Sequence, residues 1–138
     1  MGCDIHLVME VKRGGKWEFF KREDMRGWHV NRNYDLFAKM SDTYNNGKIT
    51  PICDARGLPA DVTEHTRDIL DDLFDQSYLT ANEIEELGNW LRKEYPDAQD
   101  IEAMYFERLQ GYNWSNFAKH PEWFSGVEDI RFVFGYDN

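Results

Sequence analysis

The strongest constraint on the fold is an alternation of apolar and polar residues over positions 3–12. A period of two indicates a β-strand with one buried face, because successive side chains of a strand point to opposite sides of the sheet. The odd positions are apolar and predict the core face, whereas the even positions are mostly polar and include Asp4 and His6. The glycines at positions 14 and 15 suit a tight hairpin turn. A second strand over residues 16–22 is therefore expected to pair antiparallel with the first.

Helical patterns occupy the middle of the chain. Asn31 or Asn33 is expected to cap a short helix, and the pairs Asp61/Glu64 and Thr80/Glu83 resemble capping boxes that open two longer helices. Apolar residues at helical spacing ahead of Gly111 predict a further helix. The expected helices cover residues 34–40, 61–76, 80–95 and 98–110, with a short connection at 77–79 and a long ordered loop at 41–59.

The end of the chain returns to strand periodicity, with alternating apolar residues over 127–136. Strands at both ends and helices between them predict a single α+β domain covering residues 1–138. Its small antiparallel sheet would consist of the N-terminal hairpin and the C-terminal strand, with three to four helices packed on one face. The last strand is expected to pair either with the first strand or with the other edge of the hairpin. If it pairs with the first, Arg131 lies on a sheet face that could be the one carrying Asp4 and His6.

Composition excludes several classes of protein. The formal net charge of −10 argues against direct nucleic-acid binding, because neutralising phosphates requires a basic surface. The two cysteines, Cys3 and Cys53, form no metal-binding or disulfide pattern, which favours a reducing compartment. We find neither a signal peptide nor an apolar run long enough to span a bilayer, and His6 stands where an acylation signal needs Ser or Thr. A cytoplasmic protein without membrane attachment is expected.

Asp4 and His6 are the first candidate site residues. Two side chains on one face of a strand suit two metal ligands, or an acid that orients an imidazole. A metal site needs further ligands, and no spacing among the remaining acids and histidines matches a known signature. A divalent metal is left open, with Asp4 and His6 as its ligands. The alternative is structural, with Asp4 paired to an arginine and His6 hydrogen-bonded beneath the helices.

Arginine and aromatic residues supply the second set of candidates. Arginine presents a planar fork to phosphate or carboxylate, and tyrosine offers a stacking face with a hydroxyl group. These groups predict a pocket for a small, anionic, nucleotide-like ligand, while the alternative is that each arginine neutralises an acid within the fold. The expected ligand-binding residues are Asp4, His6, Arg32, Asn33, Tyr34, Arg56 and Arg131.

Other chemistry has weaker support. Cys3 falls on the predicted core face, where a thiol is inert, and no serine lies in a nucleophile motif. Two helices carry acidic faces that are most simply solvated but could also imitate a row of phosphates. These faces consist of Asp68, Asp71, Asp72 and Asp75, followed by Glu83, Glu85 and Glu86.

Several short motifs occur in order along the chain: Met-Gly-Cys-Asp-Ile-His at 1–6, Arg-Asn-Tyr-Asp-Leu-Phe at 32–37, Arg-Gly-Leu-Pro at 56–59, Tyr-Leu-Thr at 78–80 and Arg-Phe-Val-Phe at 131–134, before a final Asp-Asn. In these short motifs and their order, the chain resembles a family of small bacteriophage and prophage proteins. The resemblance implies a host bacterial cytoplasm and carries over no functional residues.

By analogy with accessory phage proteins, an anti-defence role is expected, with either a nucleotide-like ligand or a host defence protein as partner. The leading hypothesis is ligand binding. The alternatives are a metal-dependent phosphoester hydrolase using Asp4 and His6, and an acidic mimic of nucleic acid that blocks a host effector. Homo-oligomerisation and enzymatic turnover are left open.

Overall fold

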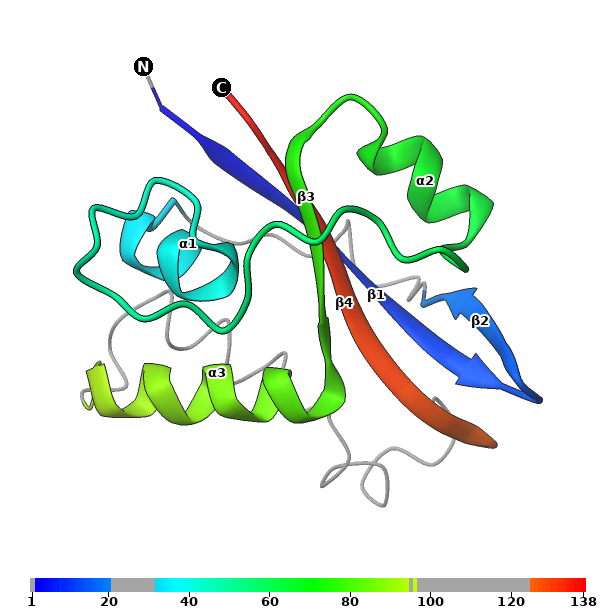
Figure 1. The fold of residues 1–138 in the computed structure, drawn as a ribbon. Helices are drawn as coiled ribbons and strands as arrows, with labels where there is room; N and C mark the ends of the chain where they lie inside the picture. Colours follow the sequence, from blue (N-terminus) through cyan, green and yellow to red (C-terminus); the bar gives the residue numbers. More distant parts are fainter. Residues whose placement is uncertain (1, 21–31, 95, 97–124) are drawn as a thin grey trace.

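The computed structural model describes residues 2–20, 32–94, 96 and 125–138. These residues form an antiparallel sheet and three helices, which confirms the α+β class (Figure 1). The helix expected over 98–110 lies outside the described residues. The elements in chain order are β1 (Asp4–Arg13), β2 (Lys16–Phe19), α1 (Tyr34–Ser41), α2 (Glu64–Leu70), β3 (Phe74–Thr80), α3 (Ala81–Glu94) and β4 (Val127–Asp137).

The sheet has the strand order β2-β1-β4-β3, and every neighbouring pair is antiparallel. The hairpin of β1 and β2 expected from the sequence is confirmed. Of the two places open to the terminal strand, β4 takes the one beside β1. In this register Asp4 faces Asp137 and Glu10 faces Arg131. The start of β1 therefore lies next to the end of β4, and the chain termini are adjacent in Figure 1.

The odd-numbered face of β1 is buried as predicted. Met9 and Val11 are fully inaccessible to solvent, and this face packs against α1 and α3. The removal of each such side chain from water contributes about 1.5–3 kcal/mol to the free energy of folding. The core on this face includes Cys3, Ile5, Leu7, Leu36, Phe37, Met40, Ile84, Leu87, Leu91, Phe132 and Phe134.

The even-numbered face has its own, smaller core. Val8 and Val133 pack against Leu70 of α2, with Leu73 and Tyr78 at the periphery. The three described helices are therefore divided between both faces of the sheet, and the expectation that they all pack on one face is wrong. Val8 accounts for the position of α2. It is an apolar residue on the otherwise polar face of β1, and α2 packs over this face and buries it.

The sequence prediction for residues 61–79 is wrong in detail. It placed a helix to about residue 76, but α2 ends at Leu70 and a fourth strand, β3, begins at Phe74. Ser77 and Leu79 are buried in this strand through its pairing with β4, and this tertiary contact overrides the local helical spacing. Gln76 donates from Nε2 to the Leu70 carbonyl at 2.7 Å and so satisfies the end of the helix.

The predicted helix starts are partly confirmed. Asn33 caps α1, and the Thr80/Glu83 capping box opens α3, with Thr80 N donating to Glu83 Oε1 at 3.0 Å. Asp61 does not cap α2. Thr63 does, by accepting a hydrogen bond from a backbone N–H of the first turn at 3.1 Å. The carboxylate of Asp61 instead accepts a hydrogen bond from Arg131.

Candidate functional site

A cavity of about 540 Å³ lies at the end of the sheet where β1 begins and β4 ends. It is lined by backbone and side chains from three parts of the chain: the segment before β1, the region of α1 with the loop that follows it, and the residue after β4. The lining residues are Gly2, Cys3, Tyr34, Tyr44, Asn46 and Asn138. We call this cavity the tyrosine pocket.

Tyr34 and Tyr44 are the two aromatic residues of the pocket. They are 42% and 53% exposed, and among the described residues Ile69 is the other large hydrophobic residue with comparable exposure. Their rings meet edge to face at a centroid distance of 5.7 Å. The Tyr34 hydroxyl accepts a hydrogen bond from Cys3 N at 3.1 Å, and the Tyr44 hydroxyl donates to Asn138 Oδ1 at 2.9 Å. Each ring is fixed by its hydroxyl group while much of its surface stays open to solvent.

The backbone of Tyr44 is held in the left-handed region, with φ of 52°. A non-glycine residue in this region pays about 1–2 kcal/mol, because Cβ approaches the carbonyl oxygen. The neighbouring loop compensates through Asn45, whose Nδ2 donates to Asp42 Oδ1 at 2.8 Å and to the Ile49 carbonyl at 2.7 Å. The loop therefore holds Tyr44 in its exposed position.

Sequence reasoning did not identify Tyr44 or Asn46 as site residues. The signal was available in part, since the long loop at 41–59 was expected to be ordered and Asn45-Asn46-Gly47 marks a turn within it. What the sequence could not indicate is that this loop lies beside the end of the sheet. Asn33, a predicted site residue, serves as the cap of α1.

An ion pair and a side-chain hydrogen bond lie beside the pocket. Arg32 binds Asp4 Oδ1 at 2.9 Å, and His6 Nε2 lies 2.7 Å from Asp137 Oδ2, with all four side chains about half exposed. Asp4 and Asp137 face each other across β1 and β4. Like charges directly opposite in a sheet repel. Each acid has a side-chain partner of its own, Arg32 for Asp4 and His6 for Asp137. Asp4 raises the pKa of Arg32 further through this hydrogen bond.

Gly2 allows Arg32 to lie against the chain. A Cβ atom built on Gly2 would fall on the guanidinium group of Arg32. The absence of a side chain at position 2 therefore lets the guanidinium group approach the backbone closely beside the pocket.

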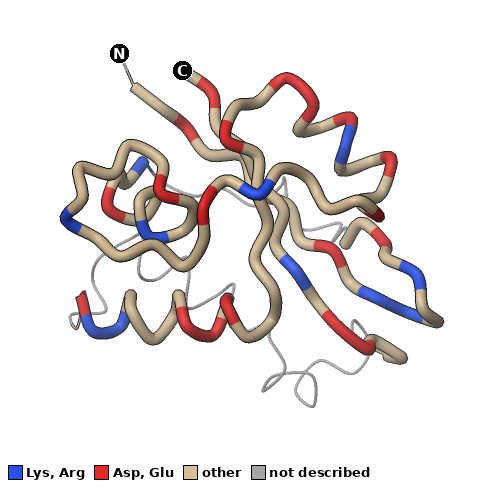
Figure 2. Tube along the Cα trace, viewed as in Figure 1, with Lys and Arg blue, Asp and Glu red and all other residues tan. Residues whose placement is uncertain are grey.

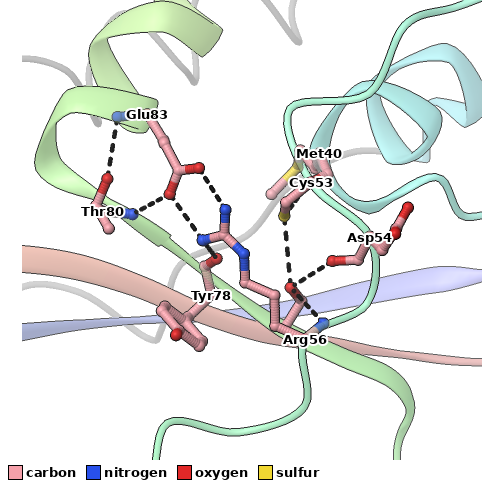
Figure 3. Close-up of polar contacts among 8 residues, drawn as sticks. Met40, Cys53, Asp54, Arg56, Tyr78, Thr80 and Glu83 are labelled. Atoms are coloured by element: carbon pink, nitrogen blue, oxygen red, sulfur yellow. Dashed lines mark hydrogen bonds and ion pairs between the residues drawn. The ribbon is translucent and has the colours of Figure 1, made fainter.

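Arg56, also predicted as a ligand-binding residue, lies in a separate cluster (Figure 3). Its guanidinium group donates to the Tyr78 carbonyl at 3.0 Å and to both carboxylate oxygens of Glu83, and it lies over the Tyr78 ring. Its backbone N–H donates to Ser77 Oγ. Figure 3 also shows Cys53, whose thiol donates to the Met40 carbonyl. These contacts attach the loop before α2 to β3 and α3.

Arg131 forms a third cluster, which is largely buried. It binds Glu10 Oε1 at 2.6 Å and Asp61 Oδ1 at 2.7 Å, and its guanidinium carbon lies 3.9 Å from the centre of the Trp17 ring. Arg131 is on the same face as Asp4, as expected once β4 pairs with β1. It is opposite Glu10, however, six positions further along β1, which separates it from Asp4 by roughly 20 Å. The predicted site residues are thus divided among three places.

The arrangement of side chains gives little support to covalent or metal-dependent catalysis. Cys3 is buried, and burial, reinforced by the charge of Asp4, raises the pKa of its thiol, which makes it a poor nucleophile. No group of three or more His, Cys, Asp or Glu side chains in the described part of the chain could hold a metal ion. Asp4 and His6 are each bound to another side chain and have no third ligand there.

Acidic residues dominate α2 and its flanks (Figure 2). Asp68, Asp71 and Asp72 are exposed, as expected for a solvated face.

Within residues 2–20, 32–94, 96 and 125–138, no helix has the length and apolar character needed to cross a membrane.

Comparisons with protein-family models, with curated proteins and with solved structures found no match for this chain.

Proposed function

We propose that this protein binds a small planar ligand with an anionic group, of the nucleotide-derived class, in the tyrosine pocket. The observation that carries the proposal is Tyr44, a large aromatic residue held exposed in a strained backbone conformation at the edge of a cavity. Backbone strain persists only where the surrounding structure maintains it, and it is concentrated at functional sites. The Tyr44 ring contacts Tyr34 and Phe74 and still leaves about half of the residue exposed, and a ligand that covers this surface would account for the exposure.

The lining residues suit a flat heterocycle with a polar edge. Tyr34 and Tyr44 offer ring surface, and stacking of a base on an aromatic side chain is worth about 1–3 kcal/mol. The side-chain amides of Asn46 and Asn138 provide donors and acceptors for the edge of such a ring. The volume of about 540 Å³ is within the range of small-molecule sites.

Arg32 is the candidate partner for the anionic group. It lies against Gly2 at the pocket wall, and its ion pair with Asp4 is exposed. An exposed ion pair contributes little to stability, so a phosphate could replace Asp4 at small cost. Arginine binds phosphate through two parallel hydrogen bonds, which favours this exchange.

The proposal is for binding rather than turnover. No carboxylate or imidazole side chain is among the residues that line the pocket, and Asp4 and His6, beside it, are bound to Arg32 and Asp137. The pocket and the resemblance to phage proteins together lead us to propose further that the ligand is a host signalling nucleotide, which the protein sequesters.

Isothermal titration calorimetry against cyclic nucleotides, cyclic dinucleotides and ADP-ribose-type compounds tests this proposal. Tyr44→Gly removes the ring and suits the left-handed backbone, so the fold should persist while affinity falls by about tenfold or more. Ile69→Ala is the matched control, because it removes an equally exposed apolar side chain outside the pocket. It should bind as the unmodified protein does.

Asp4→Asn tests the role of Arg32 separately. This change releases the guanidinium group and removes a negative charge near the ligand, so anionic members of the panel should bind about fivefold more tightly. A flat calorimetric response across the whole panel, or equal affinities for Tyr44→Gly and Ile69→Ala, would overturn the proposed function.

A further inference from the structure

We propose that Asn46 is a site of spontaneous deamidation, and that its conversion places a carboxylate in the wall of the tyrosine pocket. Asn46-Gly47 is the single Asn-Gly pair in the sequence, and it lies at the exposed tip of the loop after α1. Both reacting groups come from these two residues: the side-chain amide carbon of Asn46 and the backbone nitrogen of Gly47.

The geometry leaves both groups available. Neither the Asn46 side chain nor the Gly47 N–H makes a hydrogen bond within the described residues. Gly47 has φ of 78°, and the space where its Cβ would stand is open. Without a side chain at position 47, the backbone nitrogen can approach the neighbouring amide without obstruction.

The adjacent asparagine shows how the same fold protects an amide. The Asn45 side chain donates to Asp42 Oδ1 and the Ile49 carbonyl and accepts from Ile49 N. Its amide is therefore held in place, and its successor is Asn46 rather than glycine. Two asparagines in one loop thus provide a reactive site and an internal control.

The reaction needs only water. The Gly47 nitrogen attacks Cγ of Asn46, a new C–N bond forms, and the bond from Cγ to the amide nitrogen breaks. The proton lost by Gly47 N passes through solvent to the departing nitrogen, which leaves as ammonia. Water then opens the resulting five-membered imide at either carbonyl, giving aspartate or isoaspartate, a gain of about 1 Da and one negative charge.

The consequence for binding rests on the proposed function. Asn46 lines the pocket, so the new carboxylate would face the ligand and add to the charges of Asp4 and Asp137 nearby. An anionic ligand should then bind about fivefold more weakly, because two like charges a few ångströms apart repel even in water. Conversion of Asn46 would therefore lower the affinity for the ligand slowly and irreversibly.

Peptide mass spectrometry after incubation of the folded protein in warm, mildly alkaline buffer tests the modification. Trypsin releases residues 40–48 as one peptide that contains both asparagines, and fragmentation distinguishes them. We expect conversion at Asn46 within about tenfold of its rate in the free peptide, since loop tips are the least protected parts of a fold. Asn45 should stay unmodified. Asn46→Gln, which keeps an amide at the same position, should abolish the mass gain.

Two results would overturn the modification: Asn46 intact in the folded protein while the free peptide converts, or a mass gain that persists in Asn46→Gln. The effect on binding is tested by calorimetry of Asn46→Asp with the nucleotide panel, where unchanged affinity would refute it. If the folded protein deamidates but no nucleotide binds either form, the proposed function fails and the modification site stands.

Discussion

Replacement of Arg131 by methionine should destabilise the protein more than any other single loss of an ion pair described above. Arg131 and Glu10 are 7% and 0% exposed, so removing the cation leaves a carboxylate in the interior of the sheet. Thr66 Oγ1 and Thr63 N still donate to Glu10, at 2.7 and 3.0 Å, and these hydrogen bonds limit the damage without neutralising the charge. Breaking a buried pair by removing one partner typically costs about 3–5 kcal/mol.

The contact with Trp17 adds to this loss, since a desolvated cation over an aromatic ring contributes about 1–2 kcal/mol. Methionine retains most of the apolar stem, so the comparison reports mainly on the charge. Arg13 in the same sheet is the comparison: it binds Glu18 at 2.7 Å in a more exposed pair and also donates to the Ser125 carbonyl at 3.0 Å. Arg13→Met should cost less than about 1 kcal/mol.

Urea denaturation followed by circular dichroism gives both free energies of unfolding. The expected difference between Arg131→Met and Arg13→Met is at least about 2 kcal/mol, with unchanged dependence on urea concentration. If Arg131→Met does not fold, the double variant Glu10→Met/Arg131→Met should restore a cooperative transition, because it removes both charges together. Equal losses for the two single variants would refute the argument that burial determines the cost.

Three further changes test other parts of the fold. Gly135→Ala places Cβ 2.8 Å from Cβ of Leu73, so the urea midpoint should fall by an equivalent of about 1–3 kcal/mol, and an unchanged midpoint would contradict this close approach. Thr63→Ala removes the cap of α2 and should cost about 1 kcal/mol in the same assay, whereas Thr63→Ser should cost less. The hydrogen bond from Arg131 lowers the pKa of Asp61, so this carboxylate stabilises the fold above its unfolded pKa of about 3.9 and loses that effect as pH falls through its lower folded value. Asp61→Asn should therefore flatten the acid limb of stability against pH, and a curve parallel to that of the unmodified protein would contradict the assignment.

The sequence predicted those elements whose pattern is local. Alternation located β1 and its buried face, and side-chain capping groups located the starts of α1 and α3, because both signals depend on neighbouring residues. β3 was missed because the apolar residues Leu73 and Phe74 continue the helical spacing of α2. In the structure these two residues pack against opposite faces of the sheet, as neighbouring residues of an extended chain do, and Phe74 pairs with Tyr136 of β4.

Acidic composition decides which arginine remains available for a ligand. The chain has 26 acidic and 16 basic residues, and each of the three candidate arginines is paired with an acid: Arg32 with Asp4, Arg56 with Glu83, and Arg131 with Glu10. Their side chains are 49%, 28% and 7% exposed, respectively. A ligand must displace the existing partner, and the cost rises with burial because the abandoned carboxylate is less well solvated. Arg32, the most exposed of the three, is also the one beside the tyrosine pocket. Of these three arginines, Arg32 is therefore the one whose acidic partner a small anion would displace at the lowest cost.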